Sequence, residues 1–102
     1  MKRIEAIIKL SKLHVVKNAL AEHGIDEMTV CEVKGFGRQD RHIETYRGGE
    51  YTVDFLPRIK IDLVVLEQNA ERVVKIIIKS TNSDDDKVFI SDIEEARCAF
   101  AI

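Results

Sequence analysis

The residues best suited to recognising another molecule are concentrated in one segment in the middle of the chain, residues 35–57. Its sequence, GFGRQDRHIETYRGGEYTVDFLP, contains four glycines, three arginines and two tyrosines, and shows no apolar periodicity. Arginine and tyrosine are enriched at protein interfaces, and glycines at both ends of a segment allow it to change conformation. The composition favours a loop that docks on a protein partner. An idle, solvated extension of a hairpin has the same composition, so that reading stays open.

Other groups of reactive side chains are weaker candidates. His42 and Glu44 could both contact a metal ion, but two ligands do not make a site. The run Asp84–Asp86 lacks the spacing of an EF-hand loop and is more typical of a solvated turn. No nucleophile–base pair is visible, so an enzyme such as a phosphatase is the least favoured class. We therefore predict no catalytic residues and no metal site.

Composition and charge exclude several other classes of protein. The formal net charge of −2 gives the whole chain no electrostatic preference for nucleic acid or for an anionic membrane. No apolar run approaches the roughly 20 residues that span a bilayer, and the start of the chain does not resemble a signal peptide. Cys31 and Cys98 form no short-spaced pair. We therefore expect a cytoplasmic protein with reduced thiols, no nucleic-acid partner and no direct membrane insertion.

Four segments have the patterns of β-strands. Residues 2–10 and 58–66 alternate between apolar and charged side chains, which is the period of a strand with one buried face. Residues 28–36 are rich in β-branched side chains, and residues 87–93 form a fourth short strand. Cys31 lies in the second of these strands, and we expect it to be a small core residue.

Two segments have the patterns of helices. Ser11 is predicted to cap the first helix, which Gly24 ends in a left-handed conformation. Asn69 is predicted to cap the second, and a turn follows from Ser80. Apolar side chains at helical spacing support both helices, with Leu13, Val16 and Leu20 in the first and Ala70, Val73, Val74 and Ile77 in the second.

The order of these elements predicts an α+β, ferredoxin-like fold (βαββαβ) in a single domain of residues 1–102. In this fold a four-stranded antiparallel sheet carries two helices on one face, and a long loop joins the second and third strands. We expect that loop to have no secondary structure of its own and to end at Pro57. The other sheet face would combine Ile7 and Val64 with charged side chains. Since a half-apolar face is unfavourable in water, we expect several copies to pack there.

Three stretches closely resemble the PII signal-transduction family of nitrogen regulators: MKRIEAIIK, GFGRQ and TYRGGEYTVDFLPRIKI. The similarity runs without a gap from Met1 to about Lys79. It implies a homotrimer whose long loop is the family's T-loop, here about residues 37–55, which inserts into channels and enzymes to regulate them. The implied function is non-catalytic regulation of nitrogen metabolism. A target enzyme or transporter would be controlled in response to a small-molecule effector, namely an adenine nucleotide and, in many members, 2-oxoglutarate with magnesium-ATP.

The resemblance also assigns roles to individual residues. Tyr51 matches the tyrosine that is uridylylated in relatives. Arg58 stands where the family usually has the lysine that pairs with the 2-oxoglutarate carboxylate, and Gln39 matches the residue that organises magnesium and the oxo acid. The implied nucleotide- or effector-binding residues are Thr29, Gly35, Gly37, Arg38, Gln39, Arg58 and Lys87. The implied partner-binding residues of the loop are Arg41, Tyr46, Arg47, Glu50 and Tyr51.

The chain departs from the family pattern after Lys79. The family has a glycine-rich segment, TGxxGDGKIF, where this chain reads STNSDDDKVFI, about three residues shorter and without glycine. Glycine-rich turns let backbone N–H groups point at phosphates, whereas aspartates place like charge there. Cys98 and Phe100 occupy the places of two cleft arginines near the C-terminus, where Arg97 could partly stand in. We therefore expect no required cofactor and weak or lost ATP binding. The alternative is a divergent sensor outside nitrogen control that binds AMP, ADP or bicarbonate.

Overall fold

The computed structural model describes residues 1–36, 42–46, 49–53, 55–84 and 86–97, and between residues 36 and 54 it describes the backbone of the strands alone. The elements follow one another as β1 (Lys2–Lys9), a 3-10 helix η1 (Leu10–Lys12), α1 (Leu13–Glu22), β2 (Thr29–Phe36), β3 (His42–Tyr46), β4 (Gly49–Val53), β5 (Phe55–Val65), α2 (Glu67–Thr81) and β6 (Lys87–Asp92). Neither described helix has the length and apolar character needed to span a bilayer.

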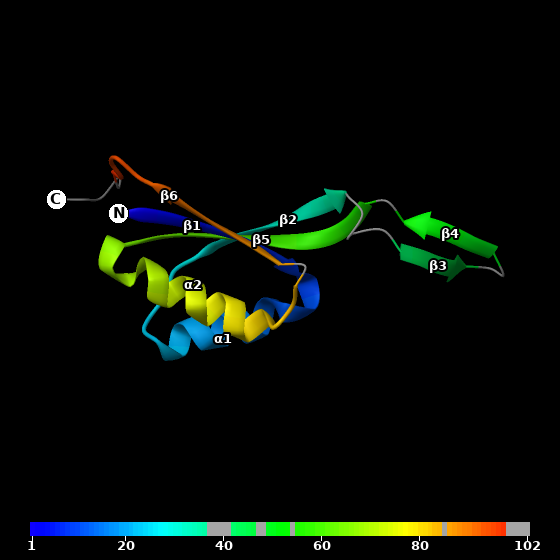
Figure 1. Cartoon of the computed structure of the whole chain (residues 1–102), viewed down its shortest axis with the longest axis horizontal. Coiled ribbons are helices and arrows are strands. Elements are labelled where there is room, and N and C mark those ends of the chain that lie inside the picture. Colours follow the sequence, from blue (N-terminus) through cyan, green and yellow to red (C-terminus); the bar gives the residue numbers. More distant parts are fainter. Residues whose placement is uncertain (37–41, 47–48, 54, 85, 98–102) are drawn as a thin grey trace.

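The main sheet has four antiparallel strands in the order β2-β5-β1-β6, and both helices cover one of its faces (Figure 1). This arrangement confirms the predicted ferredoxin-like fold. The order follows from the alternation in β1 and β5. Each of these strands has apolar side chains on one face along its length, so both can occupy the centre of the sheet with that face against the helices.

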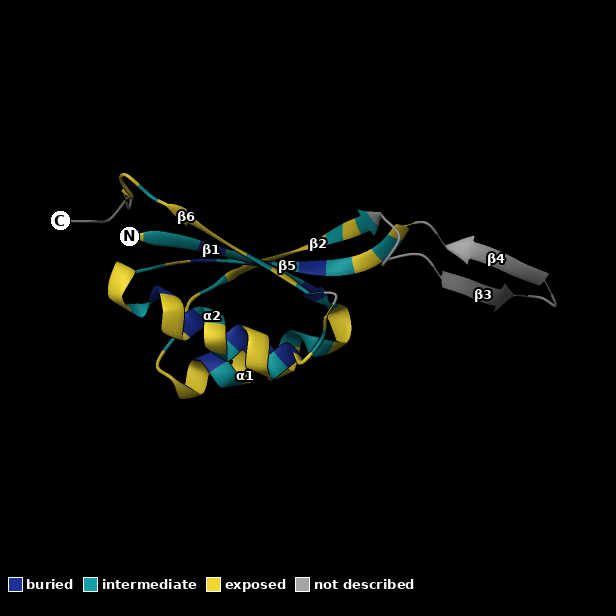
Figure 2. Ribbon diagram, in the orientation of Figure 1, coloured by how far each residue is buried: buried dark blue, intermediate teal, exposed yellow. Residues whose placement is uncertain are grey.

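The core lies between the sheet and the two helices (Figure 2). The register pairs Ile4 with Leu63, Ala6 with Ile61 and Ile8 with Ile59, and all six side chains are buried. The helices bury the stripes expected from their spacing against this face: Val16 and Leu20 from α1, and Ala70, Val73 and Ile77 from α2. These buried side chains hold the two helices against the sheet.

The helix starts differ from the predictions. Ser11 lies inside η1, and α1 begins after Lys12, whose side chain makes no capping hydrogen bond, so the predicted Ser11 cap is wrong. The predicted Asn69 cap is also wrong, because α2 already begins at Glu67. The Asn69 N–H lies inside the helix and donates to Leu66 O at 2.9 Å. A carboxylate in the first turn offsets the positive end of the helix dipole, so Glu67 supports the earlier start.

The helix ends are nearer to expectation. Gly24 follows α1 with a φ of +81°, a left-handed conformation that glycine adopts without strain. The predicted turn from Ser80 begins later, because α2 continues to Thr81. Asn82 then takes a left-handed conformation with φ of 46°, and its N–H donates to Ile78 O at 3.1 Å. Asparagine tolerates this region better than most residues, which explains why the helix stops here.

The segment predicted to lack secondary structure contains a β-hairpin, so that prediction is wrong. β3 and β4 pair antiparallel, with Ile43 opposite Thr52 and Glu44 opposite Tyr51. Their β-branched and aromatic residues flank glycines, which is a hairpin pattern. Pro57 does not end the loop either, because β5 begins at Phe55 and Pro57 pairs with Lys34 of β2. β1 pairs with β5 only from Arg58 onward, so the proline lies where one side of β5 is unpaired.

Candidate functional site

The sheet face away from the helices carries a ladder of charged side chains. Arg3 donates two hydrogen bonds to Asp62, from Nε to Oδ1 at 3.1 Å and from Nη2 to Oδ2 at 2.6 Å. Arg3 Nη1 also lies 3.1 Å from Glu5 Oε1, and Lys60 Nζ lies 3.0 Å from Glu5 Oε2. These four residues therefore form a continuous ion-pair network across β1 and β5.

The network keeps Asp62 ionised. The hydrogen bonds from Arg3, and then the positive charge of its guanidinium, hold the pKa of the Asp62 carboxyl below its ordinary value of 3.8, against an opposing effect of burial. The same pair raises the pKa of Arg3. Two-point binding of a carboxylate by an arginine also fixes its orientation. Asp62 is thus a fixed negative charge on the open sheet face.

Asp62 lines a small cavity together with Thr29, the first residue of β2. The two residues are cross-strand neighbours, and the cavity of about 270 Å³ is also lined by Glu27, Met28, Leu63 and Val64. The hydroxyl and carboxylates are hydrogen-bond acceptors, and the remaining walls are apolar. Such a lining suits a flat heterocycle that carries an amino group. The cavity thus contains one predicted nucleotide-binding residue, Thr29.

The other predicted residues on the main sheet lie elsewhere. Lys87 begins β6, the opposite edge strand from β2, and its backbone is in register with Ile7. With two strands between the edges, Thr29 and Lys87 are separated by at least about 14 Å across the sheet. Lys87 is the first residue of β6, whereas Arg97 follows the other end of that strand. Arg97 Nε donates to Glu95 Oε1 at 2.6 Å. A single chain therefore does not bring these cations to the Thr29 cavity.

Gly35 and Arg58 lie on the paired strands that lead toward the hairpin. Gly35 pairs with Leu56 of β5, and Arg58 pairs with Val33 of β2 and with Lys9 of β1. Arg58 Nη1 donates to Pro57 O at 3.1 Å. These two predicted residues are therefore close to each other along the β2–β5 pair and farther from the Thr29 cavity.

Several predicted residues lie outside what the structure describes. Gly37, Arg38, Gln39, Arg41 and Arg47 belong to this group, as do Cys98 and Phe100. For Tyr46, Glu50 and Tyr51 only the strand backbone is described, with Tyr46 opposite Gly49 in the hairpin. Their predicted roles stay predictions.

The segment before β6 contains a buried carboxylate. Both side-chain oxygens of Asp86 are buried and have no hydrogen-bond partner among the described residues. Asp84 is exposed, and Lys87 follows Asp86 directly with an exposed side chain. A buried carboxylate without a partner is costly, and it opposes the approach of another anion. The segment is therefore a poor surface for phosphate.

One prediction about the open sheet face is wrong. Cys31 is exposed, because it lies on β2 opposite Lys60 and faces away from the helices. The register of β2 with β5 shows this, since Val30 pairs with the buried Ile61 and successive side chains alternate. The sequence reasoning also missed the Arg3–Asp62 pair. The alternation places Arg3 and Asp62 on one face, but only the register shows that they are neighbours.

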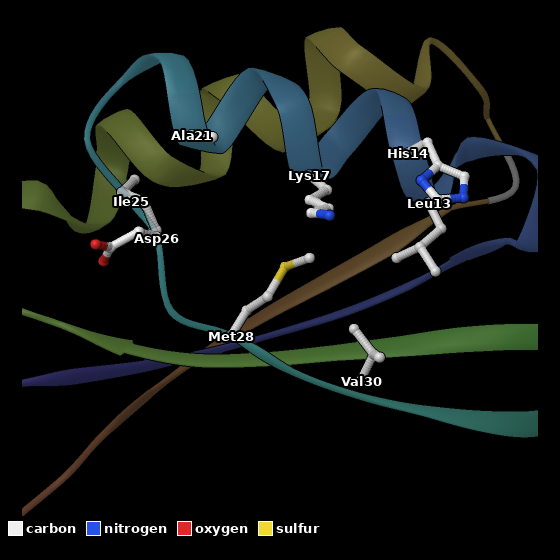
Figure 3. A pocket seen from close by; sticks show the side chains of 8 residues that line it. All are labelled: Leu13, His14, Lys17, Ala21, Ile25, Asp26, Met28 and Val30. Carbon is white, nitrogen blue, oxygen red and sulfur yellow. The ribbon is translucent and has the colours of Figure 1, made fainter.

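A further cavity, of about 510 Å³, lies between α1 and β2 (Figure 3). Lys17 extends from α1 into the space between helix and strand, with Leu13 and His14 at one end and Asp26 at the other. Ala21, Ile25, Met28 and Val30 complete the mostly apolar lining. None of the predicted site residues lines this cavity.

The Arg3–Asp62 pair predicts a pH-dependent stability. Because the folded pKa of Asp62 is lowered, its contribution is fully present above pH 3.8 and is lost as the pH falls through the folded pKa. At pH 7, Asp62→Asn should lower the free energy of unfolding by about 1 kcal/mol, a modest value because the pair is partly exposed. Urea unfolding at pH 7 and at successively lower pH should show the gap between the two proteins closing below about pH 4. A gap that is constant with pH would contradict the assignment.

The chain is similar to known proteins over most of its length. The chain matches the family "Nitrogen regulatory protein P-II" over residues 1–99. It is 51% identical over 98 residues to nitrogen regulatory protein P-II of Rhizobium meliloti (strain 1021), covering 93% of this chain and 88% of the relative. It is 52% identical over 99 residues to nitrogen regulatory protein P-II of Rhodospirillum rubrum, covering 94% and 88%.

A third relative is nitrogen regulatory protein P-II 1 of Escherichia coli (strain K12). It is 52% identical over 96 residues, which cover 91% of this chain and 86% of the relative. The match therefore covers almost the whole chain. This chain belongs to the nitrogen regulatory protein P-II family.

Proposed function

We propose that this protein is a non-catalytic, cytoplasmic regulator of nitrogen metabolism that acts on a target enzyme or transporter through its β3–β4 hairpin. Family membership is the observation that carries the proposal, and identity to relatives at about half of the aligned positions favours nitrogen control over a sensor that has left it. The hairpin supports a docking role, because it extends beyond the end of the main sheet, away from the helices (Figure 1).

The effector site is proposed to form between subunits of a homotrimer. Thr29 and Lys87 lie on opposite edges of the sheet, so they can serve one ligand only if edges of two copies meet. A closed ring of copies brings each edge against the other edge of its neighbour. Exposed apolar side chains on the open face, Val64 and Phe89 among them, would then be covered.

The proposed effector is an adenine nucleotide whose ring lies in the Thr29 cavity. The ionised Asp62 carboxylate and the Thr29 hydroxyl offer acceptors to an amino group, and Val64 offers apolar contact. Gly35 and Arg58 lie on β2 and β5, the strands that lead to the hairpin, so a ligand contacting them can favour one hairpin conformation. Regulation requires that the effector bind two hairpin states with different affinity. Gln39 and Arg58 are the residues proposed to contact 2-oxoglutarate.

Modification of Tyr51 tests the regulatory role of the hairpin. Tyr51→Phe removes the hydroxyl that would accept a uridylyl group and retains the ring, so stability should change by less than about 0.5 kcal/mol. Mass spectrometry of the protein from nitrogen-starved cells should find a uridylyl adduct on the peptide that contains Tyr51. The adduct should be lost in Tyr51→Phe and retained in the matched variant Tyr46→Phe. An adduct that persists in Tyr51→Phe, or none on the unaltered protein, would contradict the assignment.

A further inference from the structure

A basic groove runs between the two helices on the side that faces away from the sheet. It has a volume of about 540 Å³ and is lined by Val15, Ala19, His23, Arg72, Lys75, Ile76, Lys79 and Ser80. The residues that α2 contributes lie on one flank of the helix, apart from the stripe that it buries against the sheet. Figure 2 shows exposed positions along the outer surfaces of both helices. The groove is thus open to solvent and separate from the open sheet face.

The charged side chains that line the groove are all positive. Arg72, Lys75 and Lys79 are exposed, and among the described residues that line the groove there is no carboxylate. Arg72 Nη1 donates to the backbone oxygen of His23 at 3.3 Å, which leaves its charge unneutralised. No ion pair to Lys75 or Lys79 occurs within the described part of the chain. The whole chain has a formal net charge of −2, so this cluster is a local excess.

The spacing of these cations is unfavourable for the helix itself. Lys75 and Lys79 are four residues apart and Arg72 and Lys75 three apart, so like charges are neighbours on one surface, which destabilises a helix. Lys79 lies in the last turn, where the helix dipole favours a cation. Arg72 is favoured by the carboxyl end of α1, since it donates to His23 O. Glu71, four residues before Lys75, offsets part of the repulsion at Lys75. An anionic partner would remove the repulsion.

The floor of the groove is apolar. Val15 is 49% exposed although it lies on a helix that packs against the core, and Ile76 and Ala19 are half-buried beside it. The hydroxyl of Ser80 donates to Ile76 O at 2.6 Å and is therefore already satisfied. An apolar floor with cations along one wall fits a ligand that has an apolar stripe and an acidic flank. A small inorganic anion would leave the floor uncovered.

We propose that the groove between α1 and α2 is a second docking surface, which binds an acidic amphipathic helix of a partner protein. From Arg72 to Ser80 the groove follows about 12 Å of α2, so it accommodates two to three turns of a helix. The apolar side chains of the partner would cover Val15 and Ile76, and its Asp or Glu side chains would lie against Lys75 and Lys79. The surface lies on the helical layer, so its occupation does not require the hairpin.

Titration with a designed peptide tests the proposal. The probe is a helical peptide of about 18 leucine and glutamate residues, long enough to be helical in water, with leucines at positions i, i+3, i+4 and i+7. Isotope-labelled protein should show shifted NMR signals for Val15, Ala19 and Ile76 on addition of the peptide. Lys75→Gln/Lys79→Gln should weaken binding about fivefold, and raising the salt concentration should weaken binding to the unaltered protein.

Two controls make the test specific. Lys17→Gln/Lys34→Gln removes the same charge from exposed positions outside the groove and should leave the affinity unchanged. A peptide with glutamine in place of each glutamate should bind at least about fivefold more weakly. Equal binding of the glutamine peptide, or shifts confined to other surfaces, would overturn the proposal. It would also be overturned if tripolyphosphate or phosphatidylserine vesicles bound through Lys75 and Lys79 while the peptide did not.

Discussion

ATP should bind at least about a hundredfold more tightly to an Asp84→Gly/Asp86→Gly variant than to the unaltered protein. The two substitutions restore the glycines of the family pattern GDGK, which aligns with Asp84–Lys87. Glycines let successive N–H groups point at a phosphate, whereas two carboxylates repel it. At about 4 Å each repulsion costs roughly 1 kcal/mol in water and roughly 4 kcal/mol near a protein surface. A total near 3 kcal/mol corresponds to the expected hundredfold.

The buried position of Asp86 increases the expected effect. Its carboxylate oxygens are shielded from water and have no hydrogen-bond partner among the described residues, so no hydrogen bond in this part of the chain stabilises their charge. Repulsion between anions is stronger in such surroundings than in bulk water. The penalty grows with the number of phosphates. AMP and ADP should therefore bind the unaltered protein more tightly than ATP when no divalent ion is present.

Isothermal titration calorimetry with AMP, ADP and ATP, each with and without magnesium, measures these affinities. Glu22→Gln/Glu71→Gln is the matched control, because it changes the net charge equally at exposed helix positions and should leave the affinity for ATP unaltered. Micromolar affinity of the unaltered protein for ATP without a divalent ion would refute the prediction. It would mean that Lys87, Arg97 or a neighbouring subunit compensates for the missing glycines.

Phe89→Lys should convert the proposed trimer into single chains. Phe89 is 53% exposed on the open sheet face and lies opposite Glu5 in β1. A lysine opposite Glu5 is a favourable cross-strand pair, so the isolated chain should remain folded. Three buried lysines at a shared interface would each lose their hydration, which is a cost that association cannot offset. The substitution is therefore expected to act on assembly and not on the fold.

Light scattering after gel filtration gives the mass directly. At micromolar concentration the unaltered protein should have three times the chain mass of 11.6 kDa. Phe89→Lys should have the mass of a single chain. Ile78→Lys is the matched control, because Ile78 is 56% exposed on α2, outside the open sheet face, and its substitution should leave the trimer intact. A monomer mass for the unaltered protein would be incompatible with the proposed assembly and with an effector site shared between subunits.

The fold could be predicted from the sequence because its signals are periodic. Alternation in residues 2–10 and 58–66 identified the strands that turn out to be β1 and β5, and the buried stripes of both helices were found from their spacing. Periodicity depends on many residues together, so one exception does not change the result. Helix starts depend on one or two residues, and here Ser11 and Asn69 suggested caps that η1 and the earlier start of α2 replace.

The candidate site could be predicted less completely. Thr29 was found through the family resemblance, but the cavity beside it also depends on Asp62 and Val64, which come from another strand. That proximity depends on the register of β2 with β5, and sequence alone does not fix the register. The hairpin was missed for a different reason. Its glycines and arginines suggested a loop, although the short segments that contain Ile43 and Tyr51 have strand composition.

The place of β1 in the sheet has a consequence for how the protein is made. β1 is synthesised before both of its neighbours, because it pairs with residues 58–65 on one side and 87–92 on the other. At a synthesis rate of about 5–20 residues per second, it must wait for at least several seconds before its second neighbour exists. Contacts between such distant segments also slow folding, because a long loop has to close first. During that interval the rest of the sheet does not cover the apolar face formed by Ile4, Ala6 and Ile8. The newly made chain is therefore exposed to aggregation, or to binding by a chaperone, until β6 has been synthesised.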